Sequence, residues 1–251
     1  SGGFRAKDQM DRYLRWMRDG YLSSTGRCFD IGGTVSAALE RYEATGDPQA
    51  GVTDADTAGN GSLMRLAPVP MYLLHDASRA MVLAVEMSKT THAAVEAVDA
   101  CRYLTGLIIG ALRGDSKQNL LADLYSPVYD YWFLQEVALA PRIDAIARGV
   151  YKYKEASELP ASGYVVDTLE AALWAFDRTT TFRDGALLAV NLGNDADTSG
   201  AVYGQLAGAY YGIDGIPAAW REKLAHLPMI EDLATALLKQ TSQGIRHFTS
   251  L

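Results

Sequence analysis

Helical periodicity recurs along almost all of this chain of 251 residues, and this pattern restricts the fold more than any other feature. Apolar side chains return every three or four positions, the spacing that places them on one face of an α-helix. The stretches that show it most clearly are residues 10–17, 35–42, 104–111, 165–176 and 230–237. Convincing strand alternation, hairpin dipeptides and β-α-β spacing are not found. The chain is therefore predicted to be all-α.

Smaller signals predict where helices begin and how they pack. Thr181 and Asp184 form the pattern of a capping box, which opens a helix. A glycine recurs at every fourth position from residue 200 to residue 212, which predicts a smooth face that another helix approaches closely. Residues 157–163 are expected to form a surface loop. Because no low-complexity linker divides the chain, we expect one domain over residues 1–251.

Composition restricts the class of protein. Apolar residues make up 49% of the chain and charged residues 21%, as in ordinary globular proteins. The net charge of -7 and the pI near 5.1 argue against non-specific binding to nucleic acid or to an acidic membrane. The two cysteines, Cys28 and Cys101, are too few for a disulfide framework, and no apolar run reaches membrane-spanning length. We therefore expect a cytoplasmic protein with no nucleic-acid or membrane partner.

The densest group of oxygen ligands lies in residues 191–200. Asp195, Asp197 and Thr198 place two carboxylates and a hydroxyl within four positions, directly before a glycine-rich helical stretch. Hard divalent cations such as Mg²⁺ prefer oxygen ligands of this kind. The alternative is that these side chains only cap the following helix, a role that suits Asp and Thr. A calcium EF-hand is excluded, because Leu206 stands where its bidentate glutamate is required.

A second segment, from Gly59 to Ser62, is predicted to bring backbone close to a ligand. Glycine allows such an approach, and a turn through Asn60, Gly61 and Ser62 before a helix start can present N–H groups to a phosphate. The segment lacks the lysine and the spacing of a phosphate-binding P-loop. Its alternative is an ordinary turn in which Ser62 caps the helix that follows.

Three further side chains are candidates for the chemistry of a site. Asp30 stands between apolar residues before a helical stretch, where a raised pKa would suit acid–base chemistry, or where it would simply cap the helix. His92 ends a hydroxyl-rich run that suits a sugar or phosphate, with a structural histidine at a capped turn as the alternative. Tyr164 either stacks on a sugar or base or packs against the fold. The sequence confirms neither a hydrolase triad nor zinc-ligand spacing.

Five motifs, taken together and in this order, resemble the ADP-ribosylglycohydrolase family, which includes dinitrogenase reductase-activating glycohydrolase. They are residues 28–32 (CFDIG), 59–65 (GNGSLMR), 88–92 (SKTTH), 163–168 (GYVVDT) and 191–198 (NLGNDADT). The resemblance implies a single all-α domain of orthogonal helices. It also implies a centre of two Mg²⁺ ions, with Mn²⁺ as an alternative, at the base of an ADP-ribose cleft.

The resemblance implies roles for individual residues as well. Asp195, Asp197 and Thr198 correspond to metal ligands, and Asp30 corresponds to a catalytic carboxylate near the scissile bond. The cations would hold the vicinal hydroxyls of the distal ribose and polarise a water molecule, while a carboxylate assists proton transfer. The residues expected to bind the substrate, ADP-ribose, are Asn60, Gly61, Ser62, His92 and Tyr164.

Members of this family cleave the glycosidic bond between ADP-ribose and a protein side chain, arginine in the best-known branch. The expected substrate is an ADP-ribosylated protein or a small-molecule ADP-ribose conjugate, and the expected reaction reverses mono-ADP-ribosylation. The chain departs from the family pattern because it contains no Thr-Asp-Asp segment, which supplies the other half of the metal site from upstream. We therefore expect an N-terminally incomplete domain with impaired metal binding and little or no turnover. The alternative is a catalytically inactive ADP-ribose-binding or crystallin-like structural relative.

Overall fold

The computed structural model describes residues 3–246, with side chains from residue 3 to residue 239, and this part is built from helices. The prediction of an all-α protein is confirmed, since β-type pairing among these residues is limited to two isolated bridges. The α-helices are α1 (Ala6–Asp19), α2 (Gly33–Thr45), α3 (Pro68–Tyr72), α4 (Ala77–Lys89), α5 (Val95–Leu112), α6 (Lys117–Leu120), α7 (Tyr131–Leu134), α8 (Pro141–Ala147), α9 (Val165–Arg178), α10 (Phe182–Val190), α11 (Ala196–Tyr211), α12 (Ala218–Arg221) and α13 (Leu227–Arg246). Short 3₁₀-helices are η1 (Ala55–Thr57), η2 (Leu63–Arg65), η3 (Val150–Tyr153), η4 (Ala156–Glu158) and η5 (Ile213–Gly215).

The helix boundaries follow the sequence signals. The Thr181 hydroxyl caps α10 by accepting a hydrogen bond from the Asp184 amide at 3.1 Å, as the capping-box pattern predicts. Helix α1 ends at Asp19 and is capped by Gly20, which has a φ of 66° and whose N–H donates to the Trp16 carbonyl at 3.0 Å. A Cβ at Gly20 would lie 2.3 Å from the Gly26 carbonyl oxygen, so this turn requires glycine both for its φ and for its close approach.

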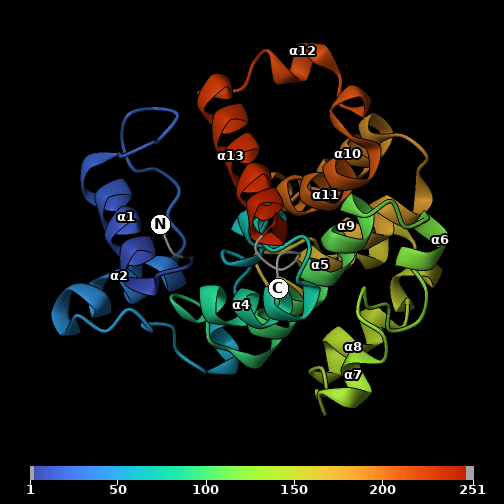
Figure 1. Cartoon of the computed structure of the whole chain (residues 1–251), viewed down its shortest axis with the longest axis horizontal. Coiled ribbons are helices and arrows are strands. Elements are labelled where there is room, and N and C mark those ends of the chain that lie inside the picture. Colours follow the sequence, from blue (N-terminus) through green and yellow to red (C-terminus); the bar gives the residue numbers. More distant parts are fainter. Residues whose placement is uncertain (1–2, 247–251) are drawn as a thin grey trace.

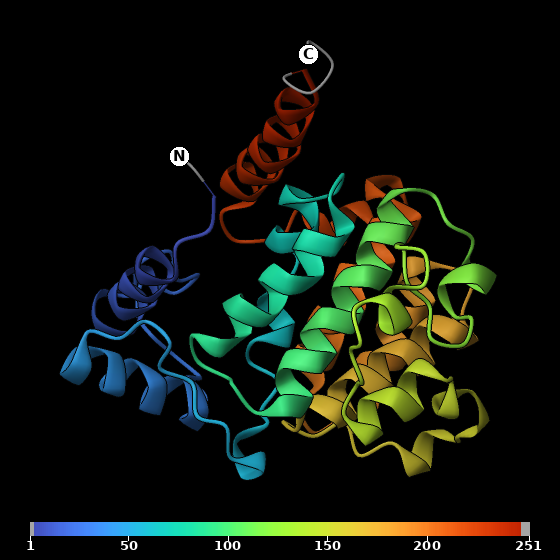
Figure 2. The same cartoon turned by 60° about the horizontal axis from the view of Figure 1, so that its bottom comes forward.

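Helix α5 is the centre of the main body. It packs against α4, α9 and α11 (Figure 2), and Leu104 and Leu107 of its predicted apolar face are fully buried. The predicted stripe on α9 enters the same core, where Leu169 and Phe176 are fully buried. Each such side chain contributes about 1.5–3 kcal/mol when it leaves water. This packed layer is the rigid base from which the loops of the site project.

The glycine row on α11 is only partly a packing surface. A Cβ at Gly200 would lie 2.9 Å from a side chain of α10, so the predicted close approach occurs there. At Gly204, Gly208 and Gly212 a Cβ would contact no neighbouring element within 4 Å, so the prediction is wrong for these three positions. The glycine that this helix pair requires most lies on α10, because a Cβ at Gly185 would stand 2.1 Å from the Tyr203 hydroxyl of α11.

Helices α1 and α2 form a small lobe with a core of its own. Met10 of α1 shares a buried cluster with Leu39 and Tyr42 of α2, and the Tyr42 hydroxyl donates a hydrogen bond to Asp11 at 2.6 Å. Figure 1 shows this lobe, in blue, beside the main body rather than within it. The apolar side chains of residues 35–42 therefore pack inside the lobe. They do not fill the boundary between the lobe and the main body, where a site can form.

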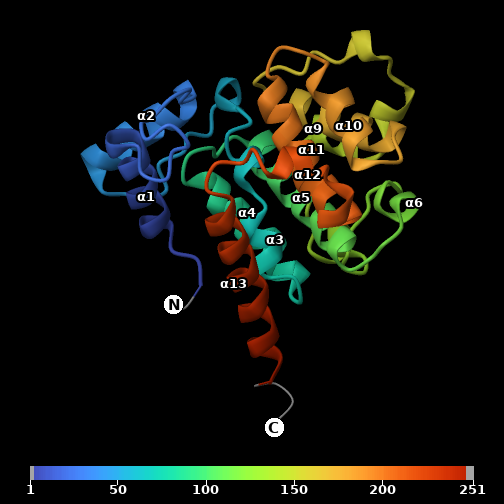
Figure 3. The same cartoon turned by 90° about the horizontal axis from the view of Figure 1, so that it is seen from above.

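Helix α13 extends away from the main body, as Figures 2 and 3 show. It packs against α3, but Ile230 and Leu233 of its predicted apolar stripe are 46% and 55% exposed. The periodicity correctly predicts a helix here, although these two side chains do not enter the core. Within the described residues, no helix combines the length and the apolar character needed to cross a membrane.

Candidate active site

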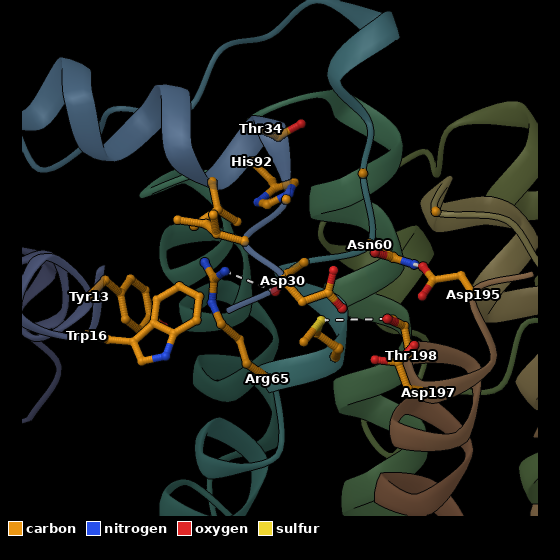
Figure 4. A pocket seen from close by; sticks show the side chains of 18 of the residues that line it. Tyr13, Trp16, Asp30, Thr34, Asn60, Arg65, His92, Asp195, Asp197 and Thr198 are labelled. Atoms are coloured by element: carbon orange, nitrogen blue, oxygen red, sulfur yellow. Dashed lines mark hydrogen bonds between the residues drawn. The ribbon is translucent and has the colours of Figure 1, made fainter. Parts of the chain in front are cut away.

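A cavity of about 640 Å³ lies where the lobe meets the main body. Its walls come from α1, the loop before α2, the Gly59–Arg65 segment and the start of α11. Figure 4 shows Tyr13 and Trp16 on one side and the side chains from α11 on the opposite side. The cavity brings together most of the residues predicted from the sequence: Asp30, Asn60, Gly61, His92, Asp195, Asp197 and Thr198.

The start of α11 supplies the acidic end of the cavity. Asp195 occupies the N-cap position, yet its side chain makes no hydrogen bond to its own helix. Its Oδ2 instead accepts a hydrogen bond from Asn60 Nδ2 at 2.7 Å. Asp197 is exposed to the cavity, and Thr198 is buried with its hydroxyl 3.9 Å from the sulfur of Met64. The alternative of a side-chain cap is therefore wrong for Asp195, whose carboxylate faces the site.

Asn60 is a buried link between two walls of the cavity. Its Nδ2 donates to Asp195 and also to the Thr168 hydroxyl at 2.8 Å, and its backbone N–H donates to the Gly163 carbonyl at 3.1 Å. Both amide hydrogens are thus used to hold protein groups. Sequence reasoning missed Thr168, although it follows Tyr164 by one helical turn in the same motif.

The glycines beside Asn60 make room for a protein side chain. A Cβ at Gly61 would lie 2.9 Å from His92 Cε1, and one at Gly59 would lie 3.3 Å from His92 Nε2. The close approach predicted for this segment is therefore, in the structure, an approach of the backbone to the His92 imidazole. His92 itself is only 2% exposed and reaches the cavity between these two glycines.

Asp30 lies in the loop before α2 and lines the cavity. Helix α2 begins after Gly32, so the alternative in which Asp30 caps this helix is wrong. The residue has a left-handed φ of 51°, a conformation that Asp and Asn tolerate better than other residues with a side chain. Figure 4 shows its carboxylate directed toward the side where Asp195 and Thr198 lie.

The structure places two predicted substrate-binding residues outside the cavity lining. Ser62 is fully buried behind it, and its hydroxyl forms a 2.8 Å hydrogen bond with the Ser88 hydroxyl. Ser62 occupies the N-cap position of η2, as the alternative has it, but its side chain makes no capping bond there. The Tyr164 hydroxyl donates to Glu96 and accepts from Arg142 at 3.3 Å. Both side chains therefore pair with protein groups in this structure.

The wall opposite the carboxylates was missed by sequence reasoning. Tyr13 and Trp16 of α1 line it, and the Arg65 guanidinium lies 4.8 Å from the centre of the Tyr13 ring. Arg65 donates to the Gly61 carbonyl at 2.9 Å and to the Thr91 hydroxyl at 2.6 Å, while its buried Nε has no hydrogen-bond partner. No carboxylate among the described residues pairs with this cation. The cavity thus has a cationic, aromatic end and an acidic end.

The residues at the acidic end fit a hard divalent cation that shares its ligand shell. Asp195, Asp197 and Thr198 offer oxygen donors, and neither carboxylate forms an ion pair with another described residue. Mg²⁺ is commonly bound by one or two carboxylates together with water and ligand oxygens. Among the described residues, no group of three or more Asp, Glu, His or Cys is gathered closely enough to hold a metal by itself. A bound cation would therefore require other oxygen ligands in addition.

The protonation of His92 should make the free energy of unfolding depend on pH. Burial, with a smaller contribution from the charge of Arg65, lowers the pKa of His92 from 6.5 to about 3. As the pH falls below about 6.5, the unfolded chain takes up a proton at this position while the folded chain does not, so the free energy of unfolding falls. The expected loss from this residue is about 1.4 kcal/mol per pH unit.

Chemical denaturation of the wild type and of His92→Gln at about pH 7 and about pH 5 measures this effect. The variant should lose less stability than the wild type between the two pH values, by about 2 kcal/mol. Equal losses would mean that His92 is protonated in the folded protein, contrary to this account.

The chain matches a known protein family over almost its whole length. Residues 1–246 match the sequence profile of the ADP-ribosylglycohydrolase family, which confirms the resemblance drawn from the five motifs. The chain belongs to the ADP-ribosylglycohydrolase family.

Two named proteins and one solved structure are similar to this chain over most of its length. The chain is 41% identical over 242 residues to ADP-ribosylarginine hydrolase Tri1 of Pseudomonas putida, covering 96% of this chain and 62% of that protein. It is 28% identical over 223 residues to ADP-ribosyl-[dinitrogen reductase] glycohydrolase of Rhodospirillum rubrum, covering 89% and 67%. A solved structure described as an ADP-ribosylglycohydrolase-related protein complex matches with a TM-score of 0.80 at 44% identity, covering 96% of this chain and 76% of that one. The chain thus spans about three fifths of the length of Tri1.

Proposed function

We propose that this chain hydrolyses the glycosidic bond between ADP-ribose and an arginine side chain. The observation that supports this best is the convergence of Asp30, Asp195 and Asp197 on one cavity that also holds the unpaired cation of Arg65. Two relatives, 41% and 39% identical to the chain, are named ADP-ribosylarginine hydrolases. The substrate would be an ADP-ribosylated protein or a smaller conjugate of ADP-ribose.

The two ends of the cavity suit the two kinds of group in ADP-ribose. Arg65 carries a charge without a carboxylate partner among the described residues, and arginine is well suited to bind phosphate oxygens. Tyr13 and Trp16 add flat apolar surface beside it. At the other end, the carboxyl oxygens of Asp195 and Asp197 can accept hydrogen bonds from sugar hydroxyls. A ligand that is anionic at one end and rich in hydroxyls at the other fits this arrangement.

Asp30 is the residue to which we assign proton transfer. Its side chain makes no hydrogen bond or ion pair to another described residue, so its carboxyl group is free to exchange a proton with the leaving group or with the attacking water. Glycosidic bonds are commonly cleaved with a carboxyl group in such a role.

Asp195, Asp197 and Thr198 are the residues that would hold a divalent cation, Mg²⁺ or Mn²⁺. When bound, the cation would place positive charge beside the oxygens of the reacting sugar. Asn60 fixes the orientation of the Asp195 carboxylate through its 2.7 Å hydrogen bond, and Thr168 fixes the Asn60 amide in turn. This chain of contacts keeps the acidic end in place before the ligand arrives.

The reaction is tested by incubating the purified chain with an ADP-ribosylated arginine peptide and Mg²⁺, and by measuring released ADP-ribose by chromatography. The expected result is release from the arginine conjugate and slower release from a serine conjugate, because this chain gathers Asp30, Asp195 and Asp197 in one cavity. This proposal replaces the expectation of little or no turnover that followed from the missing Thr-Asp-Asp segment. Binding of ADP-ribose without release would favour the catalytically inactive alternative. If the chain neither binds nor releases ADP-ribose, the proposed ADP-ribose site is rejected.

Asn60→Ala is expected to lower the rate of hydrolysis by about 10- to 100-fold, the usual effect of removing a group that orients a metal ligand. The substitution removes the hydrogen bonds to Asp195 and Thr168 but changes none of the three carboxylates that line the cavity. Asn119→Ala, an exposed position in α6 outside the cavity, is the matched control and should retain the wild-type rate. An Asn60→Ala variant with unchanged activity would show that Asp195 keeps its position without this support.

A further inference from the structure

The His92 imidazole has one ring nitrogen tied into the protein and one facing the cavity. Nδ1 lies 2.7 Å from the Thr91 hydroxyl, whereas Nε2 makes no hydrogen bond to another described residue. Nε2 lies beside Gly59 and Gly61 at the surface of the cavity. A Cβ added at either glycine would lie within 3.3 Å of this nitrogen. The ring is nine-tenths buried or more, so a ligand in the cavity is the partner that this nitrogen can reach.

The backbone of His92 leaves the ring little freedom to turn away. Its N–H donates to the Ser88 carbonyl at 2.7 Å, and its carbonyl accepts from the Ser88 hydroxyl at 2.8 Å. A parallel bridge joins His92 to Val52, and a Cβ at Gly51 would lie 2.8 Å from the His92 amide nitrogen. These contacts fix the backbone from which the ring projects, and the ring itself is held between Thr91 and the two glycines, Gly59 and Gly61.

Arg65 sets the direction of the hydrogen bonds that lead to the ring. A guanidinium group can only donate, so the 2.6 Å contact from Arg65 Nη2 to Thr91 makes the threonine oxygen an acceptor. The single hydroxyl hydrogen of Thr91 then has to be donated elsewhere. His92 Nδ1, at 2.7 Å, is its one acceptor among the described residues.

The opposite tautomer leaves a buried hydrogen without a partner. If Nδ1 carried the proton and donated to Thr91, the threonine oxygen would accept twice and its own hydrogen would have no acceptor among the described residues. Thr91 is fully buried, so water cannot replace that acceptor. Unpaired buried donors are costly and therefore rare.

We propose that Arg65 and Thr91 act as positioning residues that hold His92 as the neutral tautomer with its proton on Nε2, so that this ring donates a hydrogen bond to an oxygen of bound ADP-ribose. The inference rests on the proposed function for the identity of the ligand, but the tautomer is a property of the free protein. Desolvation and the charge of Arg65 lower the pKa of His92 to about 3, which keeps the ring neutral at ordinary pH. The Nε2 donor is then carried by a neutral ring and does not require the ring to take up a second proton.

The tautomer is read by two-bond ¹H–¹⁵N correlation spectra of the ¹⁵N-labelled full chain, with His92→Gln used to assign the signals. We expect a protonated Nε2 and an unprotonated Nδ1 in the wild type and in Thr91→Ser, which keeps the hydroxyl. Thr91→Val removes the donor to Nδ1 and should shift the ring toward a mixture of tautomers. A wild-type ring with its proton on Nδ1 would overturn the proposal without any need for a variant.

Calorimetry with ADP-ribose tests the consequence for binding. Thr91→Val should weaken the affinity for ADP-ribose by about tenfold, which is the effect of losing one hydrogen bond to the ligand. Thr91→Ser should keep the wild-type affinity. Unchanged affinity in a Thr91→Val variant that shows the altered tautomer would refute the role in binding. If the wild type binds no ADP-ribose, the proposed function fails, while the spectra still decide between the two tautomers.

Discussion

Replacing Asp195 and Asp197 together by asparagine should lower the rate of ADP-ribose release by at least about a hundredfold, because both negative charges that would hold a cation are removed from the acidic end of the cavity. Asparagine keeps the size of each side chain and is itself a good N-cap residue. The loss of negative charge at the start of α11 should lower the free energy of unfolding by about 0.3–1 kcal/mol for Asp197. The loss of activity should therefore be far larger than the loss of stability.

The measurement is single-turnover hydrolysis of an ADP-ribosylated arginine peptide in Mg²⁺, with thermal unfolding of each protein followed in parallel. Asp214→Asn with Asp232→Asn is the matched control, since both carboxylates are exposed and neither lines the cavity. The control should hydrolyse at the wild-type rate. Equal rates in the Asp195/Asp197 variant and the wild type would remove these residues from the reaction.

Asp30→Asn should lower kcat by about 10²- to 10⁴-fold while the affinity for ADP-ribose stays close to that of the wild type, because general acid–base catalysis contributes at this level. Asparagine tolerates the left-handed φ of 51° at this position, so the loop before α2 should keep its conformation. The substitution thus separates proton transfer from the shape of the cavity.

Steady-state kinetics and calorimetry on the same preparation distinguish the outcomes of Asp30→Asn. Asp19→Asn is a suitable control, because this exposed carboxylate belongs to the same lobe but lies outside the cavity lining. A parallel loss of kcat and of affinity would identify Asp30 as a binding residue instead. An unchanged kcat would rule out proton transfer by this carboxylate.

The helices and the acidic end could be predicted because their signals are local. Periodicity and capping depend on residues three or four positions apart, so α5, α9 and α10 are visible in the sequence. Asp195, Asp197 and Thr198 stand out for the same reason, being adjacent in the chain. What remained open was whether they cap a helix or face a ligand. That question depends on Asn60, whose contact to Asp195 spans 135 positions.

The cationic wall could not be predicted, because it forms only when the lobe packs beside the main body. Tyr13 and Trp16 lie on an amphipathic helix, where aromatic residues are usually part of a core. Arg65 ends the glycine-containing motif of residues 59–65, but its lack of a carboxylate partner among the described residues is a tertiary property. Ser62 likewise lies next to the cavity-lining Gly61 in sequence, yet its side chain points into the core. Two residues adjacent in sequence can therefore face opposite directions, one toward the cavity and one toward the core.

A crystal structure of the chain grown with ADP-ribose and Mg²⁺ would show where the ligand binds. The expected result is ADP-ribose in the cavity between the lobe and the main body, with a phosphate on the side of Arg65 and the terminal ribose against Asp30, Asp195 and Asp197. ADP-ribose bound elsewhere on the surface, or a cavity that holds only solvent at saturating ligand, would contradict it.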